Sequence, residues 1–205
     1  MNIKGRMEVT AIGKYKYFLI LVDDYSGFTK AFPLIDKFEA LKFYKCVCEH
    51  SCNLLNKRVT YLKFDNSKEF ISKECKEYPS DQGTVLDEIP DYTPQLNGTA
   101  ERNIRTVMNM MRSMLKAAEL PRYLLAEAIC AACYIKNRFT SSKKFTPFEL
   151  WFDQKPDISH FRIYGWKVYM HVPKQNKKLL NDRAEECILV GYGTGSTYRL
   201  KTKKT

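Results

Sequence analysis

Two acidic residues, one at the end of a strand-like run and one at the start of a helix-like run, most constrain what this chain can fold into. Residues 59–65 read VTYLKFD, a run rich in β-branched and aromatic residues that ends on Asp65. Residues 98–118 carry apolar residues at steps of three and four, which predicts a long amphipathic helix with Glu101 in its first turn. The 35 residues between the two acids could fold so that both carboxylates meet at one hard divalent cation. On spacing alone, a solvated turn acid and a helix-start acid stabilised by the helix dipole remain the simpler explanation.

The other hydrophobic patterns predict an α/β domain followed by a small all-β module. Aromatic and β-branched runs on either side of Ser26-Gly27 predict a hairpin over residues 15–35. The helix over 121–139 is apolar on most sides, so we expect it to be sandwiched between other elements. Further expected elements are helices over 38–55 and 67–78, a strand over 59–64, a small strand within 84–89, a connector over 146–160, and strands from 161 onward.

The charge of the chain favours a polyanionic partner. The 34 Lys and Arg outnumber the 23 Asp and Glu, for a net charge of +11. Binding to nucleic acid releases counterions, so such an excess favours it. A merely soluble basic protein accounts for the charge equally well. No apolar run approaches the roughly 18–20 residues of a membrane span, so we expect no membrane partner.

The seven cysteines indicate reduced thiols in an intracellular compartment, because their number is odd and they fall in expected core segments. Cys46, Cys48, His50 and Cys52 are spread around their helix and do not suggest a zinc site. Cys130 and Cys133 have redox-motif spacing, but their apolar neighbours favour buried small hydrophobic residues.

The block YTPQLNGTAERNIRTVMNMMRSML resembles the Y-T-P-Q-x-N-G-x-A-E-R block of Copia-type retrotransposon integrases, the catalytic cores of Pol polyproteins. FLILVDDYSGFTKAFPL, LKFDNSKEF, TPFELWF and ILVGYGTGSTYRL match the same family in order and spacing. The resemblance implies a ribonuclease-H-like mixed sheet with helices on both faces over residues 1–150. Over residues 158–205 it implies part of a small Src-homology-three-like β-barrel. Trp151 and Trp166 are expected to anchor a core or a domain interface.

The resemblance also implies a site. In the family, two Asp and one Glu hold two magnesium (or manganese) ions for DNA joining, and Asp65 and Glu101 match the second Asp and the Glu. The implied partners are the ends of the element DNA and the target DNA, with a possible homo-oligomer and action in the nucleus. The expected DNA-binding residues are Lys68, Tyr92, Gln95, Asn97, Arg102 and Arg105.

The chain departs from the family at two places. Asn2 stands where the family has its first catalytic Asp, and the rest of the first strand is absent. An amide supplies no negative charge to offset two dications. Lys68 lies where the family has a glycine, close to the expected metal site. Asp23 and Asp24 end a strand in the family pattern, where a structural role is the usual one.

We therefore expect an integrase fragment whose metal-dependent phosphoryl transfer, in 3′-end processing and strand transfer, is impaired by Asn2. Two alternatives stay open. One is a catalytically dead DNA-binding module, either domesticated or a remnant. The other is a nuclease of the same fold that cuts DNA without joining it.

Overall fold

A computed structural model describes residues 1–7, 9–65, 73–89, 98–139, 144–172 and 184–202, apart from the side chains of residues 65 and 73–76. Its strands are β1 (Asn2–Lys4), β2 (Tyr17–Val22), β3 (Thr29–Leu34), β4 (Tyr61–Asp65), β5 (Val85–Ile89), β6 (Lys167–His171), β7 (Ala184–Tyr192) and β8 (Tyr198–Thr202). Its α-helices are α1 (Ala40–Leu55), α2 (Lys73–Asp81), α3 (Gly98–Ala117), α4 (Leu125–Asn137) and α5 (Pro147–Phe152). Short 3₁₀ turns, η1 (Lys37–Glu39) and η4 (Arg122–Leu124), precede α1 and α4.

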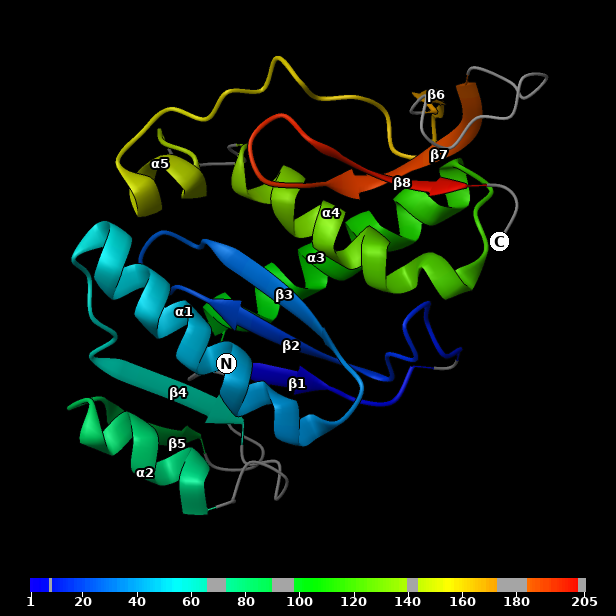
Figure 1. Ribbon diagram of the computed structural model, residues 1–205. Coiled ribbons are helices and arrows are strands. Elements are labelled where there is room, and N and C mark those ends of the chain that lie inside the picture. The colour runs from blue at the N-terminus through cyan, green and yellow to red at the C-terminus, as the bar shows by residue number, and fades with distance from the viewer. Residues whose placement is uncertain (8, 66–72, 90–97, 140–143, 173–183, 203–205) are drawn as a thin grey trace.

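The central sheet consists of two groups of strands that lie edge to edge. β1, β2 and β3 pair antiparallel, while β4 and β5 pair parallel. The groups meet where the amino group of Met1 donates to the carbonyl of Lys63 at 2.6 Å. Figure 1 shows the resulting order β3-β2-β1-β4-β5. The mixed sheet that the resemblance implies is therefore present, with a short central strand.

The two faces of this sheet bury different residues because side chains alternate along a strand. On β2, Phe18 and Ile20 join the core cluster formed with α3 and α4. Leu19, between them, joins a second cluster against α1. The sheet therefore lies between α1 on one face and the pair α3–α4 on the other (Figure 1).

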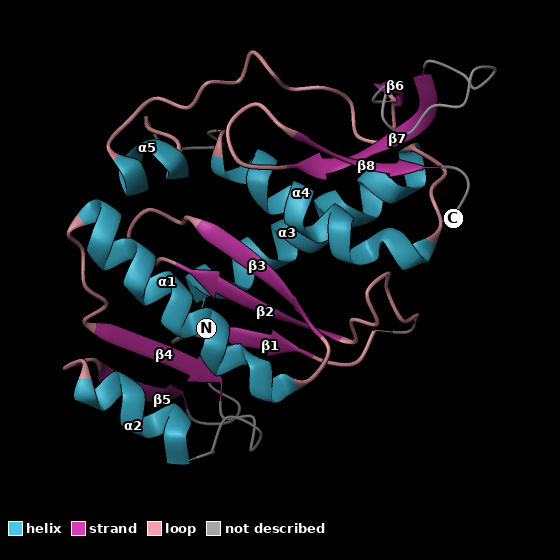
Figure 2. Ribbon diagram, in the orientation of Figure 1, coloured by secondary structure: helices cyan, strands magenta, loops and turns pink. Residues whose placement is uncertain are grey.

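Helix α4 is the innermost element, as its apolar sequence predicts. It packs against α3 and β3 on one side and against β7 on the other. Ala128, Ile129 and Ala132 on this helix have no measurable exposure to solvent. The sheet β6-β7-β8 is antiparallel and covers the side of α4 away from the central sheet (Figure 2). The chain thus has the α/β core and the separate small β-sheet that its sequence predicts.

The expectations for the connector after α4 and for the two tryptophans are met only in part. Residues 147–152 form the helix α5, because Thr146 and Glu149 build a reciprocal capping box around its first turn. Trp151 stacks on Phe28 with ring centroids 5.2 Å apart, so it anchors α5 to the β2–β3 turn as expected. Trp166 is 51% exposed, so it does not anchor a core, and its expected place at a domain interface stays a prediction.

The thiols divide into buried and exposed groups. Cys133 and Cys187 are buried, and burial raises the pKa of each thiol. Cys46 and Cys52 are exposed on α1. Within the part of the chain that the structure describes, no three His, Cys, Asp or Glu residues gather as metal ligands. No helix in that same part is long and apolar enough to cross a membrane.

Candidate active site on the central strands of the sheet

Asn2 occupies a buried position in β1. It pairs with Ile20 of β2 and is only 5% exposed. Cross-strand partners share a face of the sheet, so Asn2 lies on the face that packs against α3. Its Oδ1 has no hydrogen-bond partner among the described residues. A buried acceptor without a partner costs about 1–3 kcal/mol, so this amide lowers the stability of the sheet at this position.

Asp65 and Glu101 lie on the elements that flank Asn2. Asp65 is the last residue of β4, which lies next to β1. Glu101 is half-buried in the first turn of α3. Its neighbour Ala100 lines the same cavity as Met1. The structure therefore places Asp65 on the strand next to that of Asn2, and the start of α3 borders the same cavity as Met1.

These three residues provide two carboxylates and one amide oxygen. Magnesium takes oxygen ligands and is commonly held by one or two carboxylates, with waters and substrate phosphates completing the shell. The donor types of this set match those that one such ion accepts. It carries one negative charge fewer than the three-acid set that the resemblance implies for a pair of ions.

The predicted cations of α3 point away from the core. Arg102 and Arg105 are exposed, and Arg102 donates from Nη2 to the hydroxyl of Thr99 at 3.4 Å. Arg112 and Lys116 continue the exposed row along the helix. Such a row can bind successive phosphates of a nucleic-acid backbone. The predicted residues Lys68, Tyr92, Gln95 and Asn97 lie outside the described part of the chain.

Asp23 has the structural role that was expected. Its Oδ2 accepts hydrogen bonds from the backbone N–H of Ser26 at 2.8 Å and from the Ser26 hydroxyl at 2.5 Å. This closes the turn between β2 and β3.

Sequence reasoning missed two residues of α4, Lys136 and Asn137, that form hydrogen bonds to this turn and to the start of β3. Lys136 donates from Nζ to the carbonyl of Gly27 at 2.7 Å. Asn137 bonds both backbone groups of Thr29, accepting from its N–H at 2.9 Å and donating to its carbonyl at 2.7 Å. The sequence did contain a signal for this role, the polar pair Lys136 and Asn137 at the end of a mostly apolar helix.

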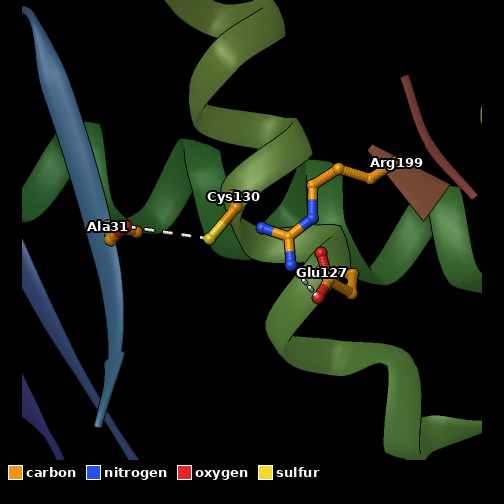
Figure 3. Close-up of polar contacts among 4 residues, drawn as sticks. All are labelled: Ala31, Glu127, Cys130 and Arg199. Atoms are coloured by element: carbon orange, nitrogen blue, oxygen red, sulfur yellow. Dashed lines mark hydrogen bonds and ion pairs between the residues drawn. The ribbon is translucent and has the colours of Figure 1, made fainter. Parts of the chain in front are cut away.

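Helix α4 also connects the central sheet to the small one, as Figure 3 shows. The thiol of Cys130 lies 3.7 Å from the carbonyl of Ala31 on β3, and burial raises its pKa to about 12. One turn earlier, Glu127 accepts from the guanidinium of Arg199 on β8 at 2.7 Å. Burial raises the pKa of the Glu127 carboxyl, and the positive charge of Arg199 offsets part of that rise.

Comparison with known proteins shows which proteins this chain is similar to. The chain is 34% identical over 197 residues to the retrovirus-related Pol polyprotein from transposon TNT 1-94 of Nicotiana tabacum. It is 28% identical over 196 residues to that of transposon RE2 of Arabidopsis thaliana. These matches cover 94% and 93% of this chain. The chain is a relative of transposon Pol polyproteins. It spans 15% and 13% of the lengths of those two relatives. The retroviral polymerase SH3-like domain family matches residues 166–205.

Solved structures show the fold of this Pol-related chain. The catalytic core of BIV integrase matches with a TM-score of 0.51 and 20% identity, covering 74% of this chain and 93% of that one. The HTLV-2 integrase core in complex with magnesium matches with a TM-score of 0.51 and 20% identity, covering 73% and 95%. A simian T-cell lymphotropic virus intasome chain matches with a TM-score of 0.57 and 15% identity, covering 99% and 76%. The central sheet and its helices therefore have the fold of an integrase catalytic core.

Proposed function

We propose that this chain is the integrase region of a retrotransposon Pol polyprotein of Copia type and that its site performs phosphoryl transfer on DNA. The observation that supports the proposal is an integrase fold in which Asn2 and Asp65 lie on neighbouring strands and Glu101 lies in the first turn of α3. In 3′-end processing, the oxygen of water forms a bond to phosphorus and the 3′ oxygen of the DNA leaves. In strand transfer, a DNA 3′-hydroxyl attacks a phosphorus of the target DNA in place of water, and a 3′ oxygen of the target strand leaves.

The proposed site residues fall into two groups, those that would hold the metal ion and those that bind the DNA backbone. Asp65 and Glu101 would hold magnesium (or manganese), with the Asn2 oxygen as a neutral third ligand. The bound ion would supply charge stabilisation at the oxygens of the reacting phosphate. Arg102 and Arg105 bind neighbouring phosphates and position the DNA against the site.

We further propose that Asn2 makes the chain a poor catalyst. The buried position of Asn2 suits a ligand, but its amide is neutral, so the site binds a divalent ion weakly. Metal-assisted joining of oligonucleotide ends tests this. Since even the indirect supports of metal ligands are worth about 10–100-fold, we expect Asn2→Asp to raise the rate by at least about 100-fold.

The matched control is Glu101→Gln in the Asn2→Asp background, which should return the rate to the background level. Joining by the unaltered chain as fast as by Asn2→Asp would contradict the proposed impairment. Separating cleaved from joined products distinguishes an integrase from a nuclease of the same fold.

The second candidate is a DNA-binding module without catalysis, which the neutral Asn2 beside an exposed row of cations favours. Its affinity for duplex DNA should fall steeply with added salt and should persist without magnesium. Loss of binding on removal of magnesium would count against this candidate.

Assembly and location follow from the proposed substrate. A homo-oligomer that binds DNA in the nucleus is the arrangement we propose for the functional form. Light scattering of the purified chain with and without DNA tests the first part, and imaging of a tagged chain tests the second.

A further inference from the structure

The turn between β2 and β3 is fixed at Gly27. This glycine has a φ of +74°, in the left-handed region that other residues rarely adopt. Its N–H donates to the carbonyl of Asp23 at 2.8 Å. Its carbonyl accepts from the Thr29 hydroxyl at 3.0 Å and from the Lys136 ammonium at 2.7 Å. Both backbone groups of Gly27 are therefore bonded, and α4 holds this point of the turn from one side.

Helix α3 touches the turn at the same glycine. A Cβ placed on Gly27 would lie 3.7 Å from Oδ1 and 3.9 Å from Nδ2 of Asn103. The Asn103 amide is therefore within van der Waals reach of this position. The same amide donates from Nδ2 to the carbonyl of Thr99 at 2.8 Å. Asn103 thus forms a bridge between the first turn of α3 and the β2–β3 turn.

A second polar side chain on α3 shows that this bridge is more than a local feature of the helix. Short polar side chains in helices often bond the carbonyl four residues earlier. Thr106 does only this, because its hydroxyl donates to the carbonyl of Arg102 at 3.0 Å while its side chain is exposed. Asn103 makes the equivalent bond to Thr99 but is half-buried against Gly27. The contact with Gly27 is what connects the helix start to the sheet.

The first turn of α3 benefits from such a bridge because a helix start is weakly held. The first four N–H groups of a helix have no partner within it, so its first turn frays readily. Ile104 is the first residue of α3 that is buried in the core, at 5% exposure. Glu101 precedes it in the first turn. The Asn103 bridge therefore adds a fixed point on the Glu101 side of Ile104.

We propose that Asn103 is a positioning residue for Glu101. Its amide holds the first turn of α3 against Gly27, and Lys136 holds Gly27 from the side of α4. Asn103 acts through the helix backbone and sets the place from which Glu101 reaches a divalent ion. The role of Glu101 rests on the proposed function, whereas the bridge is a property of the fold alone.

Amide hydrogen exchange at Arg102 tests the bridge without reference to activity. The N–H of Arg102 is among the first to bond within α3, so it reports opening of the first turn. Asn103→Ala removes both the Thr99 bond and the Gly27 contact. We expect exchange at Arg102 to become about 5-fold faster, the effect of one net hydrogen bond. Exchange at Val107, further along α3, should not change.

Two further variants identify which contact matters. Asn103→Ser keeps a hydroxyl that can bond the Thr99 carbonyl but cannot reach Gly27, so it should speed exchange at Arg102 as Asn103→Ala does. The matched control is Asn109→Ala, an exposed asparagine of the same helix, which should leave exchange at Arg102 unchanged. Unchanged exchange in Asn103→Ala would overturn the bridge. Exchange in Asn103→Ser as slow as in the unaltered chain would assign the effect to the local Thr99 bond and overturn it as well.

Manganese binding, measured by calorimetry on the Asn2→Asp chain, tests the positioning role. Indirect supports of metal ligands are worth about 10–100-fold in affinity, so Asn103→Ala should weaken binding by about 10-fold. In a Glu101→Gln background, Asn103→Ala should weaken binding no further, because its effect passes through Glu101. Unchanged affinity in the first case, or a further loss in the second, would overturn the role of Asn103.

These measurements fail separately from the proposed function. Absence of joining by the Asn2→Asp chain would overturn the proposed phosphoryl transfer. Exchange at Arg102 and manganese affinity would still decide whether Asn103 positions Glu101, since neither depends on turnover.

Discussion

Helix α4 and the slot between β2 and β4 differ in how completely their polar and apolar groups are covered. α4 has packing partners on opposite sides, and its last residue, Asn137, satisfies both backbone groups of Thr29. The slot is a cavity of about 860 Å³ between the end of β2 and β4, lined by residues of both strands and of α1. Asn2, with its own unpartnered oxygen, lies beside the slot. The difference indicates that α4 supplies stability, whereas the candidate catalytic edge lies beside the less complete part of the sheet.

The largest effect is expected for Asn137→Ala. This change removes two buried hydrogen bonds and leaves the N–H and C=O of Thr29 without partners. We expect a loss of about 2–5 kcal/mol in the free energy of unfolding, measured by urea denaturation. The matched control is Asn109→Ala on α3, where the side chain is exposed, and this change should stay within about 0.5 kcal/mol. Equal losses in the free energy of unfolding for the two variants would show that the hydrogen bonds of Asn137 add no stability.

Truncation of one valine to alanine in each region compares the two regions through the same chemical change. Val107 is fully buried on α3 in the cluster that includes α4, whereas Val47 on α1 lines the slot. Val107→Ala should cost about 2 kcal/mol, because it leaves a cavity in a packed interior. Val47→Ala should cost less than about 1 kcal/mol, because its side chain already borders empty space. A larger loss at Val47 than at Val107 would reverse the assignment of stability to α4.

Arg199→Ala should weaken the attachment of the small sheet to α4 in a pH-dependent way. Burial raises the pKa of the Glu127 carboxyl, so its ionisation already lowers stability as pH rises from the ordinary Glu value of about 4.3 through the raised one. Removing Arg199 takes away the charge that offsets this rise. The loss in unfolding free energy should therefore be larger at pH 8 than at pH 4.

The magnitude at pH 8 should be about 1 kcal/mol, since the Arg199 side chain is 55% exposed and solvent screens the pair. Urea denaturation at both pH values measures it. In a Glu127→Gln background the pH dependence of the Arg199 effect should vanish, and its persistence there would assign the effect to another group.

The smallest effect on stability is expected for Arg105→Ala. Its side chain is exposed on α3, so the free energy of unfolding should change by no more than about 0.5 kcal/mol. If Arg105 binds a phosphate, the slope of log affinity for duplex DNA against log salt should decrease by about 1. Glu119→Ala is an exposed control beyond the end of α3 and should leave that slope unchanged. An unchanged slope for Arg105→Ala would remove this residue from the DNA-binding surface.

Much of the fold could be predicted because local hydrophobic patterns dominate it. The 3.6-residue period of α3 placed Ile104, Val107 and Met111 in the core, where they are found. The hairpin around Gly27 and the sandwiched α4 followed from alternation and from an all-apolar helix. Helix α5 was missed because two capping residues, Thr146 and Glu149, stabilise a segment whose other residues resemble a loop.

The site could be predicted only in part, for a different reason. Resemblance located Asp65 and Glu101 along the chain, and it identified Asn2 as the departure. It could not show that the Asn2 oxygen is buried without a partner, because that depends on pairing with Ile20 and on packing against α3. The slot was also invisible in the sequence, since it lies between residues far apart along the chain, such as Val22 and Tyr61.

The uneven burial of the thiols gives the chain its own attachment points for spectroscopic probes. Cys46 and Cys52 are exposed on the helix that covers the slot, whereas Cys133 and Cys187 are enclosed. Among the six thiols that the structure describes, a maleimide dye applied briefly to the folded chain should therefore label those of α1 first. A fluorophore there would report events near the slot without any engineered cysteine.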